Sequence, residues 1–266
     1  MGFHSYIRAV GTGPKSNREL TKVETIDAIE SILNQSVHSE QIAAFLLGWR
    51  VRLETVEELK TTLEVCDKYI KRVKIPNSIE LGYPFDGKAD NPYLLPLIAK
   101  YLKKFDLNLV VSGDEIQPAK KGLTIKQLYQ NIEFDDNIFY FDRADYFKEL
   151  SNLTKIRNIL GLRTAFNTVE KLLNPGTSDY AVNAAFHKPY VAKYNQIFGN
   201  NYKNLIIVKG NEGTPEIFSK CKYWQTIDGK ITEYIIDPEY FGINYKKSMH
   251  IISPEESLNM TRNPSD

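Results

Sequence analysis

A chain of 266 residues with 42% hydrophobic and 25% charged side chains has the composition of an ordinary globular protein, long enough for one large or two small domains. Its 34 basic and 33 acidic side chains leave a net charge of +1, so any affinity for a polyanion must come from local patches. No apolar run approaches the ~20 residues that span a bilayer, no secretory leader opens the chain, and two distant cysteines argue against a disulfide framework, so we expect a cytoplasmic protein without membrane contact.

The first third of the chain has the pattern of a helical domain. Thr21-Lys-Val-Glu24 and Thr55-Val-Glu-Glu58 are capping boxes, in which the threonine hydroxyl accepts from a backbone N–H and the glutamate reaches back. Another helix is predicted to begin near Ser39. The apolar positions that we expect to be buried are Val23, Ile26, Ile29 and Leu33, then Ile42, Phe45, Leu46 and Trp49, then Leu59, Leu63, Cys66 and Ile70. The second set is more apolar than we expect three helices to bury alone, which predicts a homodimer with a twofold interface.

From residues 74–76 onward, short β-rich runs alternate with helical segments. The predicted strands are residues 79–81, 107–112, 138–141, 205–208 and 231–236, and the predicted helices are residues 93–104 and 178–198. Several strands are continuously apolar, as in strands covered on both faces, so the alternation predicts a mainly parallel α/β sheet. The polar tail, residues 253–266, is predicted to be irregular. The sequence thus predicts a helical domain over residues 1–75 and a larger α/β domain over residues 76–266.

One segment is more specific than a pattern of apolar residues. It runs Arg157-Asn-Ile-Leu-Gly-Leu-Arg-Thr-Ala-Phe-Asn-Thr-Val-Glu-Lys-Leu-Leu-Asn-Pro175, with a glycine that interrupts a helix and a proline that stops one. This order closely resembles a signature of the anthranilate phosphoribosyltransferase family, also called glycosyl transferase family 3. Further matches follow in the same order at residues 20–24, 41–50, 54–58, 208–217 and 236–242.

The resemblance implies a small helical domain, joined by helices from residues 157–190, on a larger α/β domain, and a homodimer formed through the helical domain. The opening segment, Ile7 to Arg18, resembles a divergent branch whose characterised members bind nucleic acid without sequence specificity. Family members carry further helices after the equivalent of Gly242, so the α/β domain is expected to be C-terminally shortened here.

The residues that match the family's donor site are altered. The family's glycine loop, G-T-G-G-D-G, is here Gly82-Tyr-Pro-Phe-Asp-Gly87, where bulky residues crowd the backbone N–H groups that hold phosphate. The basic segment K-H-G-N-R is here Val111-Ser-Gly-Asp-Glu115, which places acids where a diphosphate needs positive charge. The magnesium pair D-E is here Pro215-Glu216, and one carboxylate is a weak magnesium site. The resemblance leaves a vestigial substrate cleft of Gly82, Asp86, Gly87, Asn91, Gly113 and Arg157, with Glu216 as a vestigial metal ligand.

Positive charge is clustered elsewhere along the chain. The predicted nucleic-acid-binding residues are Arg8, Lys15, Arg18, Lys68, Lys71, Arg72, Lys74, Lys100, Lys103, Lys104, Lys120 and Lys121. Any single cluster fits a solvated surface, but together with the resemblance they indicate a surface that follows phosphates. Tyr83, Phe85 and Tyr93 are candidates for stacking on bases, although each also fits core packing.

These observations predict a catalytically degenerate member of the family that binds DNA or RNA non-specifically as a homodimer, with no catalytic residue, metal or cofactor. The alternative is an active phosphoribosyl or glycosyl transferase with an altered donor site, which would need Mg²⁺. A small-molecule sensor or structural protein that uses the old cleft is a third possibility. The sequence leaves open the choice between DNA and RNA and between single and double strands.

Overall fold

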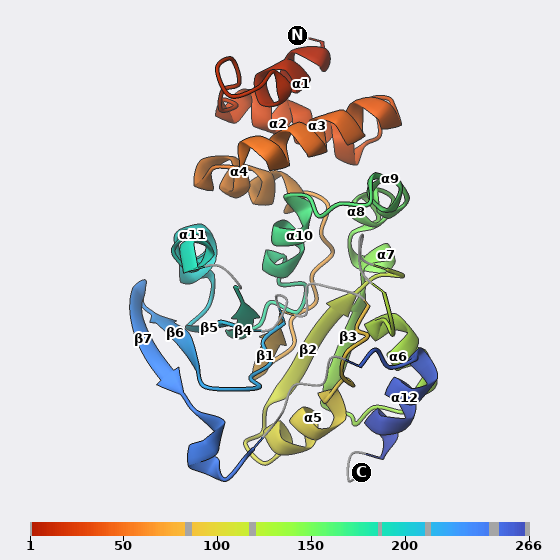
Figure 1. Ribbon diagram of the computed structural model, residues 1–266, viewed down its shortest axis with the longest axis vertical. Coiled ribbons are helices and arrows are strands. Elements are labelled where there is room, and N and C mark those ends of the chain that lie inside the picture. Colours follow the sequence, from red (N-terminus) through yellow and green to blue (C-terminus); the bar gives the residue numbers. More distant parts are fainter. Residues whose placement is uncertain are drawn as a thin grey trace. The chain divides into compact units, whose positions relative to one another are not determined.

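The computed structural model describes residues 2–82, 87–116, 121–185, 188–210, 214–244 and 250–263. The chain divides into two compact units, and each is formed from two separate stretches of sequence (Figure 1). The helical unit comprises Met1–Lys71 and Arg143–Leu173, and the α/β unit comprises Arg72–Asp142 and Asn174–Asp266. In the described residues, no helix is long and apolar enough to cross a bilayer.

The helical unit is built from short helices contributed by both of its stretches. They are α1 (His4–Gly11), α2 (Lys22–Leu33), α3 (Ser39–Arg52), α4 (Val56–Cys66), α7 (Arg143–Tyr146), α8 (Lys148–Ser151), α9 (Thr154–Leu160), α10 (Phe166–Val169) and the 3-10 turn η1 (Glu170–Leu172). The predicted capping boxes at Thr21 and Thr55 are confirmed, with both reciprocal hydrogen bonds present. Helix α1 was not predicted, because its polar and apolar residues lie in a segment without a cap signal.

The core of the helical unit is formed by one face of each long helix. Buried apolar side chains of α2, α3 and α4 include Ala28, Ile29, Ile32, Leu33, Ile42, Phe45, Leu46, Trp49, Leu59, Val65 and Cys66. The prediction for Val23 was wrong, because its side chain is 76% exposed and the buried stripe of α2 starts at Thr25. The four apolar residues of α3 that predicted a dimer are buried within the single chain. The homodimer therefore stays a prediction, and these side chains do not supply its interface.

Glu58 is a buried acid around which α3 and α4 are joined. Its carboxylate accepts hydrogen bonds from the backbone N–H groups of Leu20 and Thr55, at 2.9 and 2.8 Å, and from the indole of Trp49 at 3.1 Å. The guanidinium of Arg52 completes the set as an ion pair. Burial acts to raise the pKa of Glu58, but the hydrogen bonds from Arg52 and the backbone outweigh it and leave that pKa lowered. The acid is thus held in its charged form.

The described part of the α/β unit forms a seven-stranded sheet in the order β3-β2-β1-β4-β5-β6-β7. The strands are β1 (Ser78–Leu81), β2 (Asn108–Gly113), β3 (Ile138–Asp142), β4 (Tyr180–Ala184), β5 (Asn204–Val208), β6 (Cys221–Ile227) and β7 (Lys230–Ile236). Strands β1 to β5 pair in parallel, and β6 and β7 add an antiparallel hairpin at one edge. This arrangement confirms the predicted α/β fold with a mainly parallel sheet.

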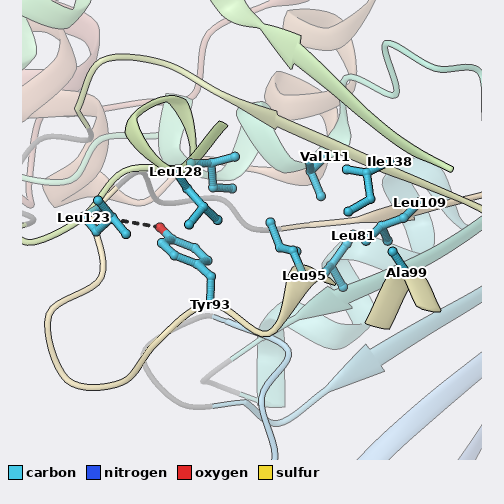
Figure 2. Close-up of a cluster of buried hydrophobic side chains, with 10 residues drawn as sticks. Leu81, Tyr93, Leu95, Ala99, Leu109, Val111, Leu123, Leu128 and Ile138 are labelled. Carbon is cyan, nitrogen blue, oxygen red and sulfur yellow. Dashed lines mark hydrogen bonds between the residues drawn. The ribbon is translucent and has the colours of Figure 1, made fainter. Parts of the chain in front are cut away.

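The helices of the α/β unit are α5 (Leu95–Lys103), α6 (Ile125–Asn131), α11 (Lys188–Phe198) and α12 (Pro254–Arg262), with 3-10 turns η2 (Gly199–Asn201) and η3 (Pro238–Phe241). Leu95 and Ala99 of α5 and Leu128 of α6 pack on Leu109 and Val111 of β2, within a larger apolar cluster (Figure 2). Tyr93 lies in this cluster and donates its hydroxyl proton to the carbonyl of Leu123 at 3.1 Å (Figure 2). One face of β1, β2 and β3 is thus covered by α5 and α6.

Two predicted segments of the α/β domain were wrong. Residues 180–184, predicted as the start of a long helix, form β4 in the middle of the parallel sheet, where tertiary pairing decides between helix and strand. The tail, predicted as irregular, contains α12, which begins at a capping box of Ser253 and Glu256 with a proline in its first turn. Strand β6 was also not predicted.

Glu80 is a carboxylic acid in the middle of β1, buried between its neighbour strands. The hydroxyl of Tyr202 donates to its carboxylate at 2.5 Å, and a backbone N–H of Asn174 also donates to it. Burial raises the pKa of Glu80 from its ordinary value of 4.5 to about 7, against the opposing effect of these hydrogen bonds. The folded chain therefore binds a proton at Glu80 more tightly than the unfolded chain does.

This raised pKa predicts a pH-dependent stability. Between pH 4.5 and about 7 the unfolded chain loses the proton first, so the free energy of unfolding falls as pH rises, by on the order of 3 kcal/mol from this group. Glu80→Gln, which keeps a neutral side chain, is expected to raise the melting temperature relative to the wild type above pH 7 but not near pH 4.5. Thermal unfolding at several pH values checks this, with the exposed Glu239→Gln as control. A melting-temperature difference between Glu80→Gln and the wild type that stays the same at all pH values would contradict the prediction.

Candidate functional site

The carboxyl ends of β1 to β5 lie at one edge of the sheet, because these strands are parallel. The strand order 3-2-1-4-5 reverses direction between β1 and β4, which is where open α/β sheets bind their ligands. Gly82 follows β1, Gly113 ends β2, and Gly210 follows β5 at this edge. The candidate site is therefore built by the segments that leave the strands here.

An ion pair between Lys88 and Glu216 is the main polar feature of this edge. Lys88 comes from the segment after β1 and Glu216 from the segment after β5, and their side chains are 5% and 11% exposed. The Lys88 ammonium also donates to the carbonyl of Pro92 at 2.7 Å and lies 5.1 Å from the ring centre of Tyr93. Burial lowers the pKa of Lys88, and the adjacent Glu216 carboxylate opposes that shift.

The second oxygen of Glu216 accepts two further hydrogen bonds. The side-chain amide of Asn91 donates at 3.2 Å and the hydroxyl of Thr214 at 3.0 Å. A Mg²⁺ ion takes oxygen ligands that carry negative charge or lone pairs, whereas this carboxylate faces an ammonium and two N–H or O–H donors. In the described part of the chain, no three acids, histidines or cysteines cluster to hold a metal. The residues present at Glu216 therefore do not fit Mg²⁺.

Acidic side chains stand where the resemblance predicts a basic segment. Asp114 is buried just after β2 and accepts from the backbone N–H of Glu115 at 2.8 Å. Lys126 of α6 forms an ion pair with Asp142 at the end of β3, at 2.9 Å. A hydrogen bond from Lys126 to Asp142 raises the pKa of that lysine, with smaller contributions from Glu115 and Asp114. This part of the edge is thus acidic, apart from one lysine that is already paired.

The predicted cleft residues have separate positions and functions in the structure. A Cβ on Gly82 would lie 2.0 Å from the side-chain amide oxygen of Asn183 in β4, so a larger residue there would displace that amide. Gly87 has a positive φ of 113°, which favours glycine. Asn91 belongs to the Glu216 cluster, and Gly113 ends β2. Asp86 lies outside the described residues, as do Tyr83 and Phe85.

Arg157, the remaining predicted cleft residue, is fully buried in the helical unit. Its guanidinium forms two hydrogen bonds to the Glu170 carboxylate, at 2.5 and 3.2 Å. Arg143 contacts the same carboxylate at 3.2 Å, so one acid is shared by two buried arginines. Within its unit Arg157 acts as part of a core ion cluster. The apolar residues of the segment 157–175 are divided, since Phe166, Val169, Leu172 and Leu173 are buried whereas Ile159 and Leu162 are exposed.

Several predicted nucleic-acid-binding residues already have acidic partners. The pairs are Arg18 with Glu24 at 2.6 Å, Lys68 with Glu30 at 2.5 Å, Lys74 with Asp179 at 3.3 Å and Lys103 with Asp136 at 2.5 Å. Arg8, Lys15, Lys71, Arg72, Lys100, Lys104 and Lys121 are exposed to solvent, and Lys120 lies outside the described residues. The nearby acids cancel much of the field of the paired cations, so Lys100 and Lys104 are better candidates for phosphate contacts than these four.

The exposed face of α5 and the turn after it combine two of these lysines with aromatic rings (α5 is labelled in Figure 1). Tyr101 and Phe105 are 60% and 59% exposed, with ring centres 5.3 Å apart. The Lys104 ammonium lies 5.8 Å from the centre of the Tyr101 ring, and Lys100 precedes that tyrosine. We call Lys100, Tyr101, Lys104 and Phe105 the α5 face.

Sequence analysis missed both aromatic residues of the α5 face. The signal was present, because residues 97, 101 and 105 repeat every four positions while the buried residues of α5 follow Leu95 and Ala99. Tyr93, for which the sequence offered base stacking or core packing, is 1% exposed, so core packing is the alternative that holds. Its ring packs on the leucines of the core instead of facing solvent.

Two domains of one known protein family match this chain. A helical bundle domain described as belonging to the glycosyl transferase family matches residues 4–66, and the a/b domain of the same family matches residues 110–264. The chain belongs to the glycosyl transferase family. This confirms the predicted family, and the match of both domains in this order agrees with a helical N-terminal domain and an α/β domain.

Relatives within the glycosyl transferase family include named enzymes. The chain is 29% identical over 238 residues to an uncharacterized protein of Aquifex aeolicus, covering 88% of this chain and 76% of the relative. It is 27% identical over 265 residues to an anthranilate phosphoribosyltransferase of Neisseria meningitidis, covering 91% and 75%.

Solved structures in the same family share the fold. Anthranilate phosphoribosyltransferase from Saccharomyces cerevisiae in complex with PRPP and Mg aligns with a TM-score of 0.75 at 16% identity, covering 98% of this chain and 80% of that chain. The enzyme from Thermus thermophilus aligns with a TM-score of 0.71 at 16% identity, covering 98% and 81%. At this identity the likeness concerns the fold alone.

The burial of Arg157 predicts a structural contribution in this member of the glycosyl transferase family. Arg157→Met is expected to lower the free energy of unfolding by about 3 kcal/mol, because it removes a cation that forms two hydrogen bonds to the buried Glu170 carboxylate. Chemical denaturation followed by circular dichroism measures the loss. Lys155→Met, an exposed change on the same helix, is the matched control and is expected to have little effect. Equal stability of the two variants would contradict the structural contribution.

Proposed function

We propose that this member of the glycosyl transferase family is a nucleic-acid-binding protein that contacts single-stranded DNA or RNA through the α5 face. The observation that carries the proposal is the exposed pair of rings, Tyr101 and Phe105, with Lys100 and Lys104 beside them. Aromatic rings of this size are normally buried, so two neighbouring rings in solvent favour a ligand with flat apolar faces. Bases have such faces, and lysines attract the phosphates that connect them.

Single strands fit the α5 face better than duplexes do. In a duplex the base faces are stacked on one another, whereas an unpaired base can stack on a side chain for about 1–3 kcal/mol. The rings lie edge to face, with 60° between their planes, so they offer surfaces in two directions and do not stack on each other. Binding that depends on stacking and phosphate charge tolerates most sequences, which agrees with the non-specific binding proposed from the resemblance.

The binding proposal makes a direct prediction. Tyr101→Ala/Phe105→Ala is expected to weaken binding of a labelled single-stranded oligonucleotide by at least about tenfold, because the stacking surface is removed. Lys100→Glu/Lys104→Glu is expected to weaken binding of all sequences alike and to reduce the slope of log affinity against log salt. Fluorescence anisotropy at two salt concentrations measures both effects.

The matched control is Tyr240→Ala/Phe241→Ala, which removes another exposed aromatic pair in the α/β unit. If binding depends on the α5 face, this control retains wild-type affinity. Equal losses in both double variants would point to general exposed apolar surface, and absence of binding by the wild type at low salt would reject the function. Preference for duplex over single strands would reject the stacking part of the proposal.

Phosphoribosyl transfer is the second candidate function, favoured by the 27% identity to an anthranilate phosphoribosyltransferase over most of this chain. Against it stand the donors and the ammonium around Glu216 and the acids after β2. We expect no turnover of phosphoribosyl pyrophosphate with anthranilate, and no saturable heat when the diphosphate and Mg²⁺ are titrated into the protein. Tight Mg²⁺-dependent binding that is lost in Glu216→Ala would make transfer the better proposal.

A further inference from the structure

We infer that the Lys88 ammonium is the permanent counterion of Glu216 and stands where a divalent cation would have to bind, so that this carboxylate fastens two loops of the site together instead of holding a metal. The inference concerns the Glu216 cluster, defined as Lys88, Asn91, Thr214 and Glu216. It goes beyond the proposed nucleic-acid binding and stands or falls independently of the α5 face.

The backbone of Lys88 is positioned by hydrogen bonds of its own. Lys88 forms an isolated β-bridge with Leu123, with N–H to carbonyl hydrogen bonds of 2.9 and 3.0 Å in the two directions. The preceding Gly122 has φ of +91°, and a Cβ there would lie 2.2 Å from the Lys88 carbonyl oxygen. Only glycine fits this approach, so the bridge fixes the point from which the lysine side chain extends.

The backbone on the glutamate side is held by a second glycine. A Cβ on Gly210 would lie 1.6 Å from the carbonyl oxygen of Thr214, so only glycine fits where these two residues approach each other. Thr214 lies beside Gly210, and its hydroxyl donates to the Glu216 carboxylate at 3.0 Å. Close backbone contacts thus position Lys88 itself and Thr214, which lies two residues before Glu216.

The charges themselves are closed off from solvent. The Lys88 ammonium donates to the Pro92 carbonyl and to Glu216, and it faces the ring of Tyr93. The Glu216 carboxylate has donors on both of its oxygens. A metal ion could bind Glu216 only after Lys88 moved away, which would leave a buried ammonium without its carboxylate partner. The Lys88 ammonium thus prevents a metal ion from solution from binding Glu216.

The pair also connects strands that are not neighbours in the sheet. Lys88 follows β1 and Glu216 follows β5, and β4 lies between these strands. Removing either charge alone leaves the other buried without its partner, whereas removing both leaves two apolar side chains. We therefore expect the double variant to lose much less stability than the sum of the losses in the two single variants.

The experiment measures melting temperatures of the full chain with and without MgCl₂, at constant ionic strength, for the wild type, Glu216→Gln, Lys88→Met and Lys88→Met/Glu216→Leu. Without Mg²⁺, each single variant is expected to melt at least about 5 °C below the wild type, and the double variant is expected to recover much of that loss. With Mg²⁺, the wild type and the double variant are expected not to change. Lys88→Met is expected to gain stability, because its uncompensated Glu216 can then take a cation.

The outcomes decide the inference in either direction. Mg²⁺ stabilisation of the wild type that disappears in Glu216→Gln would overturn it, and this comparison needs no lysine variant to fold. Additive losses in the two single variants would show that the charges do not act on each other and would also overturn it. A Lys88→Met protein that folds but gains no Mg²⁺ dependence would remove the claim that the ammonium replaces a cation. Lys121→Met, an exposed change next to Gly122, is the control for loss of one lysine.

Discussion

Two buried acids in the described residues are held by opposite charge from the same unit, and the candidate site at the sheet edge depends on one of these pairings. Glu216 is paired with Lys88 in the α/β unit, and Glu170 is shared by Arg157 and Arg143 in the helical unit. A charged group removed from water is costly unless such a partner and further hydrogen bonds surround it. Each pair thereby joins segments distant in sequence, and its members are engaged within the fold.

This constraint changes how the resemblance to transferases is interpreted for individual residues. Arg157 and Glu216 match positions of a ligand site in the family pattern, yet in this chain each already has an internal partner of opposite charge. The acids after β2 and at the end of β3 add negative charge to the same sheet edge, where one lysine is paired with Asp142. The relatives share the fold of this chain, but a shared fold does not determine which charged side chains already have a partner within the chain.

Ion pairs also reduce the set of lysines and arginines that could form a nucleic-acid-binding surface. Several of the lysines and arginines predicted to contact nucleic acid are paired with carboxylates in the structure, although their own side chains are more than half exposed. Paired cations contribute little to a long-range field, because the acid cancels them within a few ångströms. The α5 face differs from the other lysine clusters because it also carries two exposed rings, and that combination is what favours bases over a simple polyanion.

Local chemistry determined much of the secondary structure. The capping boxes at Thr21 and Thr55 act over three residues, so they can be recognised from the sequence and begin helices where expected. The runs at residues 107–112 and 205–208 became strands because continuous apolar character suits burial on both faces. The family and the α/β class followed from motif order and alternation, since both are properties of the linear chain. Segment 180–184 became a strand against expectation, because its two neighbours in the sheet supply the hydrogen bonds that a helix would have made internally.

Tertiary structure alone decided which side chains remain available for function. A lysine and a glutamate 128 positions apart form the central ion pair of the site, and no spacing rule relates such positions. Tyr93 is buried and Tyr101 is exposed, because one face of α5 and of the segment before it packs on the sheet while the other face meets solvent. The sequence by itself determined many of the elements, the family and the kinds of charge present. Burial and pairing, which arise only when distant segments pack together, decided which of those charges and rings can meet a ligand.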